Sequence, residues 1–424
     1  MNTLVIAINT KYNLTSVMFL AVFLLPTLVI PITGIQDGFY IPKLVLLYCL
    51  ALAAIFKISL DYKYEVKENL KLIGLPLSFL IITICSALLS DYQDYVWLGQ
   101  VAHFEGVITL FAYLVLMYAA QLIQWTEETK EKLVKWLLLG SLIVSVVGLL
   151  EFYGLGVMYF DEYRKNWQRI SATLGNANWI GSYSCIIIPL AIWYCIKKRS
   201  YLSLIIVCLN MALMLAAGTR SAYLGLAIVL VVALFIYSFN IQRLILIICF
   251  FLAGILLVVP RLHFIENRLI GTAIELAKYN DPLGGSYRVF IYGESFSLMK
   301  KYWLIGCGPD SYENIFPQEK MNALKIAHND TKKMHLKVTK AHSEFLQIIL
   351  TTGVFGLLTL TLIFSKAVVT CFKNQNILSR TFGICILAYL LQIAFSNSMI
   401  GVAPVFWILI GISLSEKTCH KHQL

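Results

Sequence analysis

The sequence predicts an all-α polytopic membrane protein with about 12 transmembrane helices and one large extracytoplasmic loop that contains short helices. Its 424 residues are 59% hydrophobic and only 13% charged, whereas a soluble domain is nearer half apolar and a quarter charged. Apolar runs recur along the chain at about the 20-residue length that a spanning helix needs. One long polar segment, residues 261–341, interrupts them. These three observations together indicate a chain that folds within a bilayer.

Each predicted span is a mostly apolar run bounded by charged or turn-forming residues. The last two runs are separated by Asn397 and Ser398, and a tight turn at Gly218 separates the seventh from the eighth. The expected spans are 14–33, 39–60, 70–90, 104–124, 132–154, 178–196, 200–217, 219–238, 243–260, 344–366, 378–397 and 399–415.

The positions of Lys and Arg predict the orientation, because short cytoplasmic loops carry an excess of both residues. With a cytoplasmic N-terminus, the outward loops at 32–38 and 91–103 carry no Lys or Arg, while the inward connections are basic. The inward basic residues are Lys57, Lys63, Lys67, Lys71, Lys130, Lys132, Lys135, Lys197, Lys198, Arg199, Arg243, Lys366, Lys373, Arg380, Lys417 and Lys421. Both termini are therefore expected in the cytoplasm. The first apolar run is long enough to span and has no clear cleavage site after it, so it is not expected to be a cleaved signal.

The spans and the polar segment divide the chain into four parts. Residues 1–160 hold the N-terminal transmembrane helices, and 161–260 hold central helices with Arg and Asn motifs on their outer side. Residues 261–341 form the extracytoplasmic loop, and 342–424 hold the last helices and a short cytoplasmic tail.

Two helices are expected within the loop. Apolar and charged residues alternate at helical spacing over 263–279, which is typical of an amphipathic helix at a membrane surface. Asn280-Asp281-Pro282 and Gly284-Gly285 then break the pattern, and a second helix is expected over 287–302.

Charge and cysteine usage exclude several classes of function. The net charge of +11 is better explained by membrane topology than by a nucleic-acid partner, because about half of the Lys and Arg lie in short loops between spans. Of the ten cysteines, only Cys307 lies in the long polar segment, so no disulfide framework is expected there. No CxxC occurs, and the His and carboxylate residues show no metal-ligand spacing, so neither a metal nor another cofactor is expected.

Two arginines are candidates for binding an anion on the outer side. Arg220 begins a helix at the extracytoplasmic face of the membrane, where the helix dipole and unpaired N–H groups favour negative charge. Arg288 opens the second loop helix, and its planar guanidinium can grip phosphate oxygens with paired hydrogen bonds. Taken alone, Arg220 could equally be an interfacial anchor, and Arg288 a surface residue paired with Asp281 or Glu294.

His342 is the candidate catalytic residue, because it lies where the loop enters the tenth span and a histidine is the most frequent general base. Glu344 follows it in the same motif and is a candidate substrate contact. Arg169 and Asn176 precede the sixth span on the outer side and are candidate substrate contacts, although Asn at a helix start is most simply a cap.

Four motifs resemble the O-antigen ligase and polymerase family of bacterial envelope glycosyltransferases. They are RISATLGNANWIG, GTRSAYLG, SYRVFIYGESFSLMKKYWLIGCGPDSY and AHSEFLQIILTTGVFGLL, in that order between Arg169 and Ser398. The chain departs from the family pattern where Ala177 replaces a proline and where Ser343, in place of an asparagine, follows the histidine.

The resemblance implies a GT-C-like helical glycosyltransferase of the bacterial inner membrane, acting in cell-envelope polysaccharide or lipopolysaccharide biosynthesis. The donor would be a glycan on undecaprenyl pyrophosphate, and the acceptor a hydroxyl of a glycolipid, polysaccharide or protein. The family's two arginines map to Arg220 and Arg288, and its histidine maps to His342. Such an enzyme would be metal-independent and would invert the anomeric centre.

Several alternatives stay open. Within the family, the chain could be a ligase, a polysaccharide polymerase or a protein O-oligosaccharyltransferase. From other classes, a transporter would show charges at the bilayer midplane and broken helices, whereas the polar residues here gather on one outer face. A non-catalytic scaffold would lack the set of two arginines and a histidine.

Overall fold

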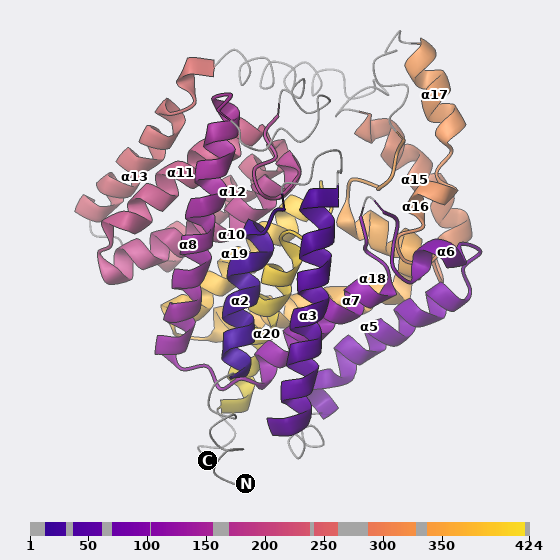
Figure 1. Ribbon diagram of the computed structural model, residues 1–424, viewed down its shortest axis with the longest axis horizontal. Helices are drawn as coiled ribbons and strands as arrows, with labels where there is room; N and C mark the ends of the chain where they lie inside the picture. The colour runs from indigo at the N-terminus through magenta and orange to yellow at the C-terminus, as the bar shows by residue number, and fades with distance from the viewer. Residues whose placement is uncertain are drawn as a thin grey trace.

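The computed structural model describes residues 13–30, 37–61, 70–101, 103–155, 169–237, 241–261, 287–327 and 337–419. Over this part of the chain every regular element is helical, which confirms the predicted all-α class (Figure 1). The N-terminal helices are α2 (Leu14–Thr27), α3 (Asp37–Asp61), α5 (Leu70–Leu88), α6 (Gln93–Val96), α7 (Val107–Leu122) and α8 (Glu127–Phe152). The central helices are α10 (Ala177–Lys198), α11 (Tyr201–Ala217), α12 (Arg220–Ile236) and α13 (Ile241–Leu256), followed by the short helix η1 (Val259–Arg261). The remaining helices are α15 (Arg288–Tyr302), α16 (Tyr312–Ile315), α17 (Gln318–Ala327), α18 (Glu344–Lys373), α19 (Ile377–Ile393) and α20 (Ala403–Cys419).

Each of the predicted spans corresponds to an apolar helix of the described chain. Four of these, α3, α8, α10 and α18, are long and apolar enough to cross a membrane, and the other apolar helices are shorter. A membrane protein is thereby supported, while the number of spans stays a prediction. The second loop helix is present as α15, whereas the helix expected over 263–279 lies outside the described residues.

Several predicted boundaries were wrong, for local reasons. Helix α8 begins at Glu127 rather than at 132, because Thr126 caps it by accepting a hydrogen bond from the Thr129 N–H and acidic residues occupy its first turn. Helix α7 begins at Val107 rather than at 104, because Gly106 has an extended backbone and the residues before it form a loop. Helix α20 begins at Ala403 rather than at 399, so a longer non-helical segment follows α19.

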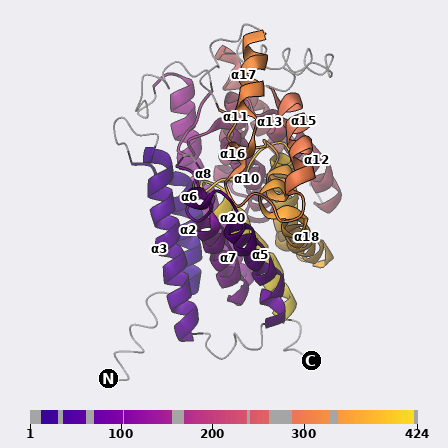
Figure 2. The ribbon, with the colours of Figure 1, turned by 90° about the vertical axis from the view of Figure 1, so that its right-hand side faces the viewer.

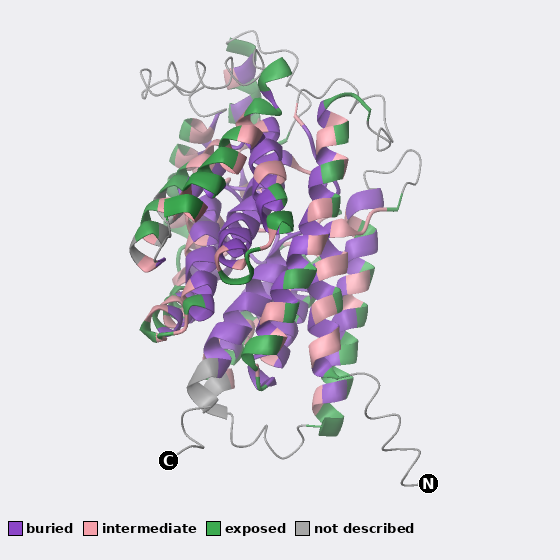
Figure 3. Ribbon diagram, turned by 90° about the vertical axis from the view of Figure 1, so that its left-hand side faces the viewer, coloured by how far each residue is buried: buried purple, intermediate pink, exposed green. Residues whose placement is uncertain are grey.

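Helices α10, α19 and α20 lie at the centre of the bundle. Helix α10 is the most buried of the four long helices, since 89% of its most apolar stretch of 18 residues lies inside the protein. It packs against α8, α11, α12 and α19, while α20 packs against α2, α7, α18 and α19. Exposed residues gather along the outer faces of the bundle, as Figure 3 shows. Small residues permit close approach: a Cβ on Gly411 would lie 2.2 Å from the Met117 carbonyl oxygen of α7.

The two ends of the bundle differ. Helices α15 and α17 lie toward its upper end in Figures 1 and 2, whereas α2 begins and α20 ends at its lower end. Helices α15 and α17 of the polar segment therefore lie at the opposite end of the bundle from the start of α2 and the end of α20, an arrangement compatible with the predicted topology.

Candidate functional site

The loop before α10 is held by two charged side chains from neighbouring helices. The Glu151 carboxylate accepts hydrogen bonds from the N–H groups of Ser171 and Ala172 and from the Ser171 hydroxyl. The buried Lys43 ammonium donates to three backbone carbonyls, including that of Thr173 at 2.8 Å. A buried charge is tolerated only when it is paired or hydrogen-bonded, so these contacts fix the loop.

Arg169 ties this loop to the turn between α11 and α12. Its Nε donates to the Ala217 carbonyl at 2.9 Å, and its terminal nitrogen donates to Asn178 Oδ1 and Thr219 Oγ1. Asn176 is the N-cap of α10, because its side chain accepts the Asn178 N–H at 2.9 Å. Both residues that were expected as substrate contacts therefore have structural partners, and the capping interpretation of Asn176 is confirmed.

Arg220 is the first residue of α12, as the sequence predicted. Gly218 ends α11 in the left-handed conformation, which a glycine adopts without strain, so the chain turns within two residues. Gln392, at the end of α19, accepts a hydrogen bond from Ser182 Oγ of α10 at 2.6 Å and donates to the Asn178 carbonyl of α10 and to Ser221 Oγ of α12. Arg220 thus begins α12 at a cluster built from α10, α12 and α19.

A second cluster forms where α18 is broken. Gly353 has φ 76° and ψ −179°, and the backbone of the 303–308 turn enters the break. The N–H groups of Cys307 and Gly308 donate to the carbonyls of Leu350 and Thr351, and the Val354 N–H donates to the Trp303 carbonyl. The backbone groups freed by the break are therefore paired, as a membrane-embedded segment requires.

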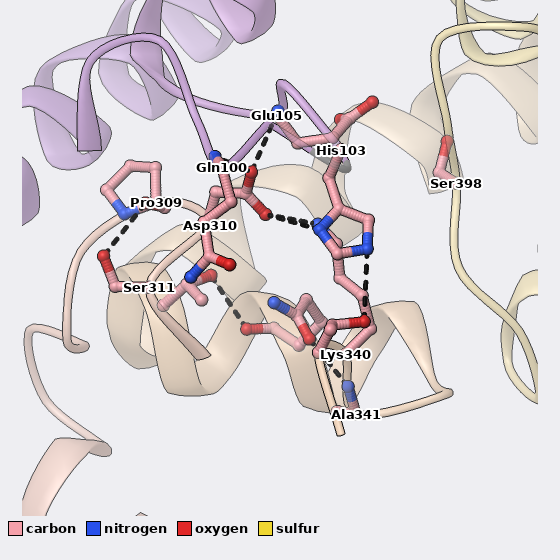
Figure 4. Close-up of polar contacts among 12 residues, drawn as sticks. Gln100, His103, Glu105, Pro309, Asp310, Ser311, Lys340, Ala341 and Ser398 are labelled. Atoms are coloured by element: carbon pink, nitrogen blue, oxygen red, sulfur yellow. Dashed lines mark hydrogen bonds and ion pairs between the residues drawn. The ribbon is translucent and has the colours of Figure 1, made fainter. Parts of the chain in front are cut away.

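Asp310, just beyond this turn, joins three segments that are distant in sequence (Figure 4). One carboxylate oxygen accepts the backbone N–H groups of Gln100 and Glu105, and the other accepts Lys340 Nζ at 2.7 Å. Burial opposes ionisation of Asp310, but the charges of Lys340 and His103 hold its pKa below the ordinary value. Asp310 thereby fastens the loop before α7 to the segment that enters α18.

Two histidines, His103 beside Asp310 and His342 within reach of the His103 charge, lie in this region. His103 Nε2 is 3.2 Å from Thr339 Oγ1, and its Nδ1 is 3.9 Å from Asp310 Oδ1. Burial and the charge of Lys340 lower the pKa of His103 to about 4. Burial, Arg288 and His103 likewise lower the pKa of His342 to about 4, so both imidazoles are neutral at pH 7.

The contacts of His342 bring it together with Arg288. Tyr292 of α15 donates its hydroxyl to the His342 carbonyl at 3.0 Å, and Arg288 begins the same helix. The charge of Arg288 acts on both His342 and Tyr292. Arg288 begins a helix, as sequence analysis expected, and His342 lies two residues before α18, which is long and apolar enough to cross a membrane.

Glu344 lies in the first turn of α18, beside a cavity of about 60 Å³. One of its carboxylate oxygens accepts the Ser398 N–H at 2.8 Å. Glu105 lines the same cavity and accepts a hydrogen bond from the Tyr113 hydroxyl at 2.8 Å. Burial and the nearby Glu344 carboxylate raise the pKa of Glu105 to about 8, although Lys340 opposes the shift.

The structure therefore groups the candidates in two clusters. Arg288, His342 and Glu344 lie at the entrance to α18, and Arg169, Asn176 and Arg220 lie around the start of α10 and α12. The end of α19 and the segment after it reach both clusters, because Gln392 of α19 contacts the second and Ser398 the first.

Sequence analysis missed Glu105, Asp310, Lys340 and Gln347, and it gave His103 little weight. A usable signal was present for two of these residues, since Asp310 and Lys340 are charged residues inside the GCGPDSY and KAHSEFLQ motifs. Within the described chain, no group of three or more His, Cys, Asp or Glu side chains has metal-binding geometry. The expectation that no metal takes part stays a prediction.

Comparison with known proteins bears on residues 204–361. This range matches the family model described as O-antigen ligase. It includes Arg220, Arg288, His342 and Glu344, whereas Arg169 and Asn176 precede it. No curated protein matches the chain.

Proposed function

We propose that the protein transfers a glycan from undecaprenyl pyrophosphate to a hydroxyl acceptor. The proposal starts from membership in the O-antigen ligase family, which the match over residues 204–361 supports. The reaction would take place on the extracytoplasmic side of the cytoplasmic membrane. The observation that carries the proposal is that Arg288 and His342, which are far apart in sequence, lie near each other. Arg288 begins α15, and Tyr292 of the same helix donates a hydrogen bond to the His342 carbonyl.

The two arginines would bind the pyrophosphate of the donor, which is the leaving group of the reaction. Breaking the anomeric C–O bond leaves negative charge on the lipid pyrophosphate, and a guanidinium in a poorly hydrated site stabilises that charge strongly. Arg288 would bind the pyrophosphate from the loop, and Arg220 would bind it from the N-terminus of α12, where the helix dipole also favours an anion.

His342 would act as the general base for the acceptor hydroxyl. A sugar hydroxyl is a weak nucleophile, and a neutral imidazole can accept its proton as it attacks the anomeric carbon. With a pKa of about 4, which burial and the charge of Arg288 lower, His342 is unprotonated at pH 7 but weakly basic. A pyrophosphate on Arg288 would offset that positive charge and raise the proton affinity of His342 once the donor is bound. Attack opposite the leaving group inverts the anomeric centre.

Within the family, ligation to a lipid core, polymerisation and protein O-glycosylation share this chemistry and differ only in the acceptor. A transporter is the alternative from another class, and the break in α18 bears on it. Unwound carbonyls of transporter helices coordinate ions. Here the Leu350 and Thr351 carbonyls instead accept hydrogen bonds from the 303–308 turn, and Ser86 also donates to Thr351. This pairing favours an enzyme.

The test is a transfer assay with protein in nanodiscs, a synthetic undecaprenyl-pyrophosphate glycan and a panel of hydroxyl acceptors. We expect transfer that survives excess chelator. Arg288→Lys should be nearly as impaired as Arg288→Ala, because an ammonium lacks the planar fork of the guanidinium. Lys320→Ala, at an exposed position on α17, is the matched control and should transfer normally. Normal transfer by Arg288→Ala would remove the residue from the site, and restoration by a divalent ion after chelation would reveal a metal-dependent reaction.

A further inference from the structure

The cavity beside Glu344 is lined by both polar and aromatic side chains. Its volume is about 60 Å³, and it lies between the loop before α7, the entrance to α18 and the start of α20. The charged and amide side chains of its lining are Glu105, Asp310, Lys340, Glu344 and Gln347. The lining also includes the rings of Phe364, Phe406 and Trp407.

Gln347 is the residue that points to a ligand. It is 5% exposed, and its Oε1 accepts the Ala341 N–H at 2.8 Å. Its Nε2 is buried without a hydrogen-bond partner in the described chain. A buried unpaired donor costs about 1–3 kcal/mol, so a group that pairs with it would be bound favourably.

The charges around the cavity restrict what that group can be. An anion would meet the Asp310 carboxylate, and a cation would meet the Lys340 ammonium, which is paired with Asp310. A neutral hydroxyl avoids both conflicts, because it can donate to a carboxyl oxygen of Glu344 and accept from the Gln347 amide at once. A carboxyl group can accept several hydrogen bonds, so Glu344 can accept one from a ligand in addition to the Ser398 N–H.

The size of the cavity narrows the class further. A single water needs about 10–15 Å³ of the space that this volume measures, so about 60 Å³ has room for a group of a few heavy atoms, such as a hydroxymethyl group. The rings of Phe406 and Trp407 suit the CH₂ part of such a group, and the polar lining suits its hydroxyl.

We propose that this cavity is an acceptor subsite, which binds a hydroxymethyl group of the acceptor glycan through Glu344 and Gln347. Lys340 and Glu344 flank His342 in sequence, and the side chain of His342 does not line the cavity. The anchored hydroxymethyl group thus leaves a different hydroxyl of the same sugar to face His342. This inference rests on the proposed transferase function and specifies what the acceptor must carry.

The experiment compares two acceptors, an alkyl hexopyranoside and its 6-deoxy analogue, in nanodiscs with the lipid-linked donor. Gln347→Glu retains the oxygen that accepts the Ala341 N–H but removes the unpaired donor, and Glu344→Gln removes the carboxylate. For the hexoside, each variant should raise the acceptor KM about fivefold to tenfold, the loss of roughly one hydrogen bond, with donor binding unchanged. For the 6-deoxy acceptor, wild type and variants should share one elevated KM. Glu128→Gln, at an exposed position on α8, is the control and should match wild type with both acceptors.

The two-acceptor design separates a subsite from a structural role. Equal losses on both acceptors would mean that Gln347 and Glu344 only support the fold, and this result would overturn the proposal. Calorimetric binding of the same two glycosides to the wild-type protein tests the subsite without any transfer. Tighter binding of the hexoside would support it even if the donor chemistry proved different, whereas equal binding would show a cavity that holds only water.

Discussion

At the scale of single residues, buried charges organise this protein. Asp310 accepts hydrogen bonds from two backbone N–H groups and from the Lys340 ammonium. Glu151 and Lys43 likewise form hydrogen bonds with the backbone of the loop before α10. Each charge is compensated by hydrogen bonds to chain segments far away in sequence. Removal of one partner would leave the other buried and unpaired, which is why such sites tolerate substitution poorly.

The role of His342 is testable by separating binding from chemistry. His342→Ala should bind the lipid-linked donor about normally, because the arginines supply that contact. Its single-turnover transfer rate should fall roughly a hundredfold to ten-thousandfold, the usual contribution of a general base. His342→Gln should be equally inactive, since an amide cannot accept the proton. Donor binding and transfer are measured side by side in nanodiscs; loss of donor binding with normal transfer at saturation would make His342 a pyrophosphate contact instead.

The pKa of Glu105 predicts a stability change with pH. Burial raises this pKa from its ordinary 4.5 to about 8 in the folded protein. The protonated carboxyl therefore favours the fold fully below pH 4.5, and the contribution is lost as pH rises through 8. Glu105→Gln mimics the neutral form and keeps an oxygen for the Tyr113 hydroxyl.

We accordingly expect the Tm of Glu105→Gln to exceed that of wild type at pH 8 and to approach it at pH 5. Thermal unfolding of both proteins across this range checks the expectation. Because His103, Asp310, Lys340 and Glu344 titrate in both proteins, the difference between the two curves reports Glu105. A difference that is constant with pH would show that Glu105 is ionised throughout.

At the scale of secondary-structure elements, the break in α18 positions the site. The helix continues on both sides of Gly353, and the 303–308 turn enters between α18 and α5, where Ser90 Oγ donates to the Cys307 carbonyl at 2.5 Å. The insertion places Asp310 beneath the loop that carries His103 and Glu105. A straight α18 would exclude the turn and separate these residues.

Gly353→Ala should therefore destabilise the protein. The backbone angles of Gly353 lie in a region open essentially to glycine, and a Cβ there would lie 2.1 Å from the Leu304 carbonyl oxygen. We expect a loss of at least about 1–3 kcal/mol in unfolding free energy. Gly293→Ala is the matched control, because a Cβ there meets nothing within 4 Å, and it should be neutral or gain up to about 1 kcal/mol. Urea unfolding in detergent compares them; equal stability of both variants would show that the insertion is dispensable.

At the scale of the whole molecule, the two ends of the bundle hold different parts of the chain. The proposed site lies with α15 and α17 near one end, and the first and last helices begin and end at the other (Figure 2). The positive-inside pattern predicts that the first end is extracytoplasmic.

Single cysteines in a Cys-free background test this topology. Lys320 on α17 and Lys198 at the end of α10 are both exposed, at 62% and 41% of the side chain. An impermeant thiol reagent added to intact cells should label Lys320→Cys and spare Lys198→Cys, and permeabilised cells should show both. The reverse pattern in intact cells would invert the orientation.

The sequence by itself determined the helical class, the positions of the apolar helices and the residues that open α12 and α15. These properties depend on local composition, helix-breaking residues and capping, which act over a few turns. It also pointed to Arg288 and His342, because both stand at predicted helix starts beside recognisable motifs.

Only the tertiary structure decided which side chains meet. The contacts of Asp310 with Gln100 and Lys340, and of Gln392 with Asn178, join segments separated by 210, 30 and 214 residues. No local pattern encodes such pairings, because burial and hydrogen bonding depend on how the helices pack. The same packing gave Arg169 its hydrogen-bond partners across α10 and the turn before α12, and it enclosed the cavity of Glu344 and Gln347, which neither motif nor periodicity could reveal.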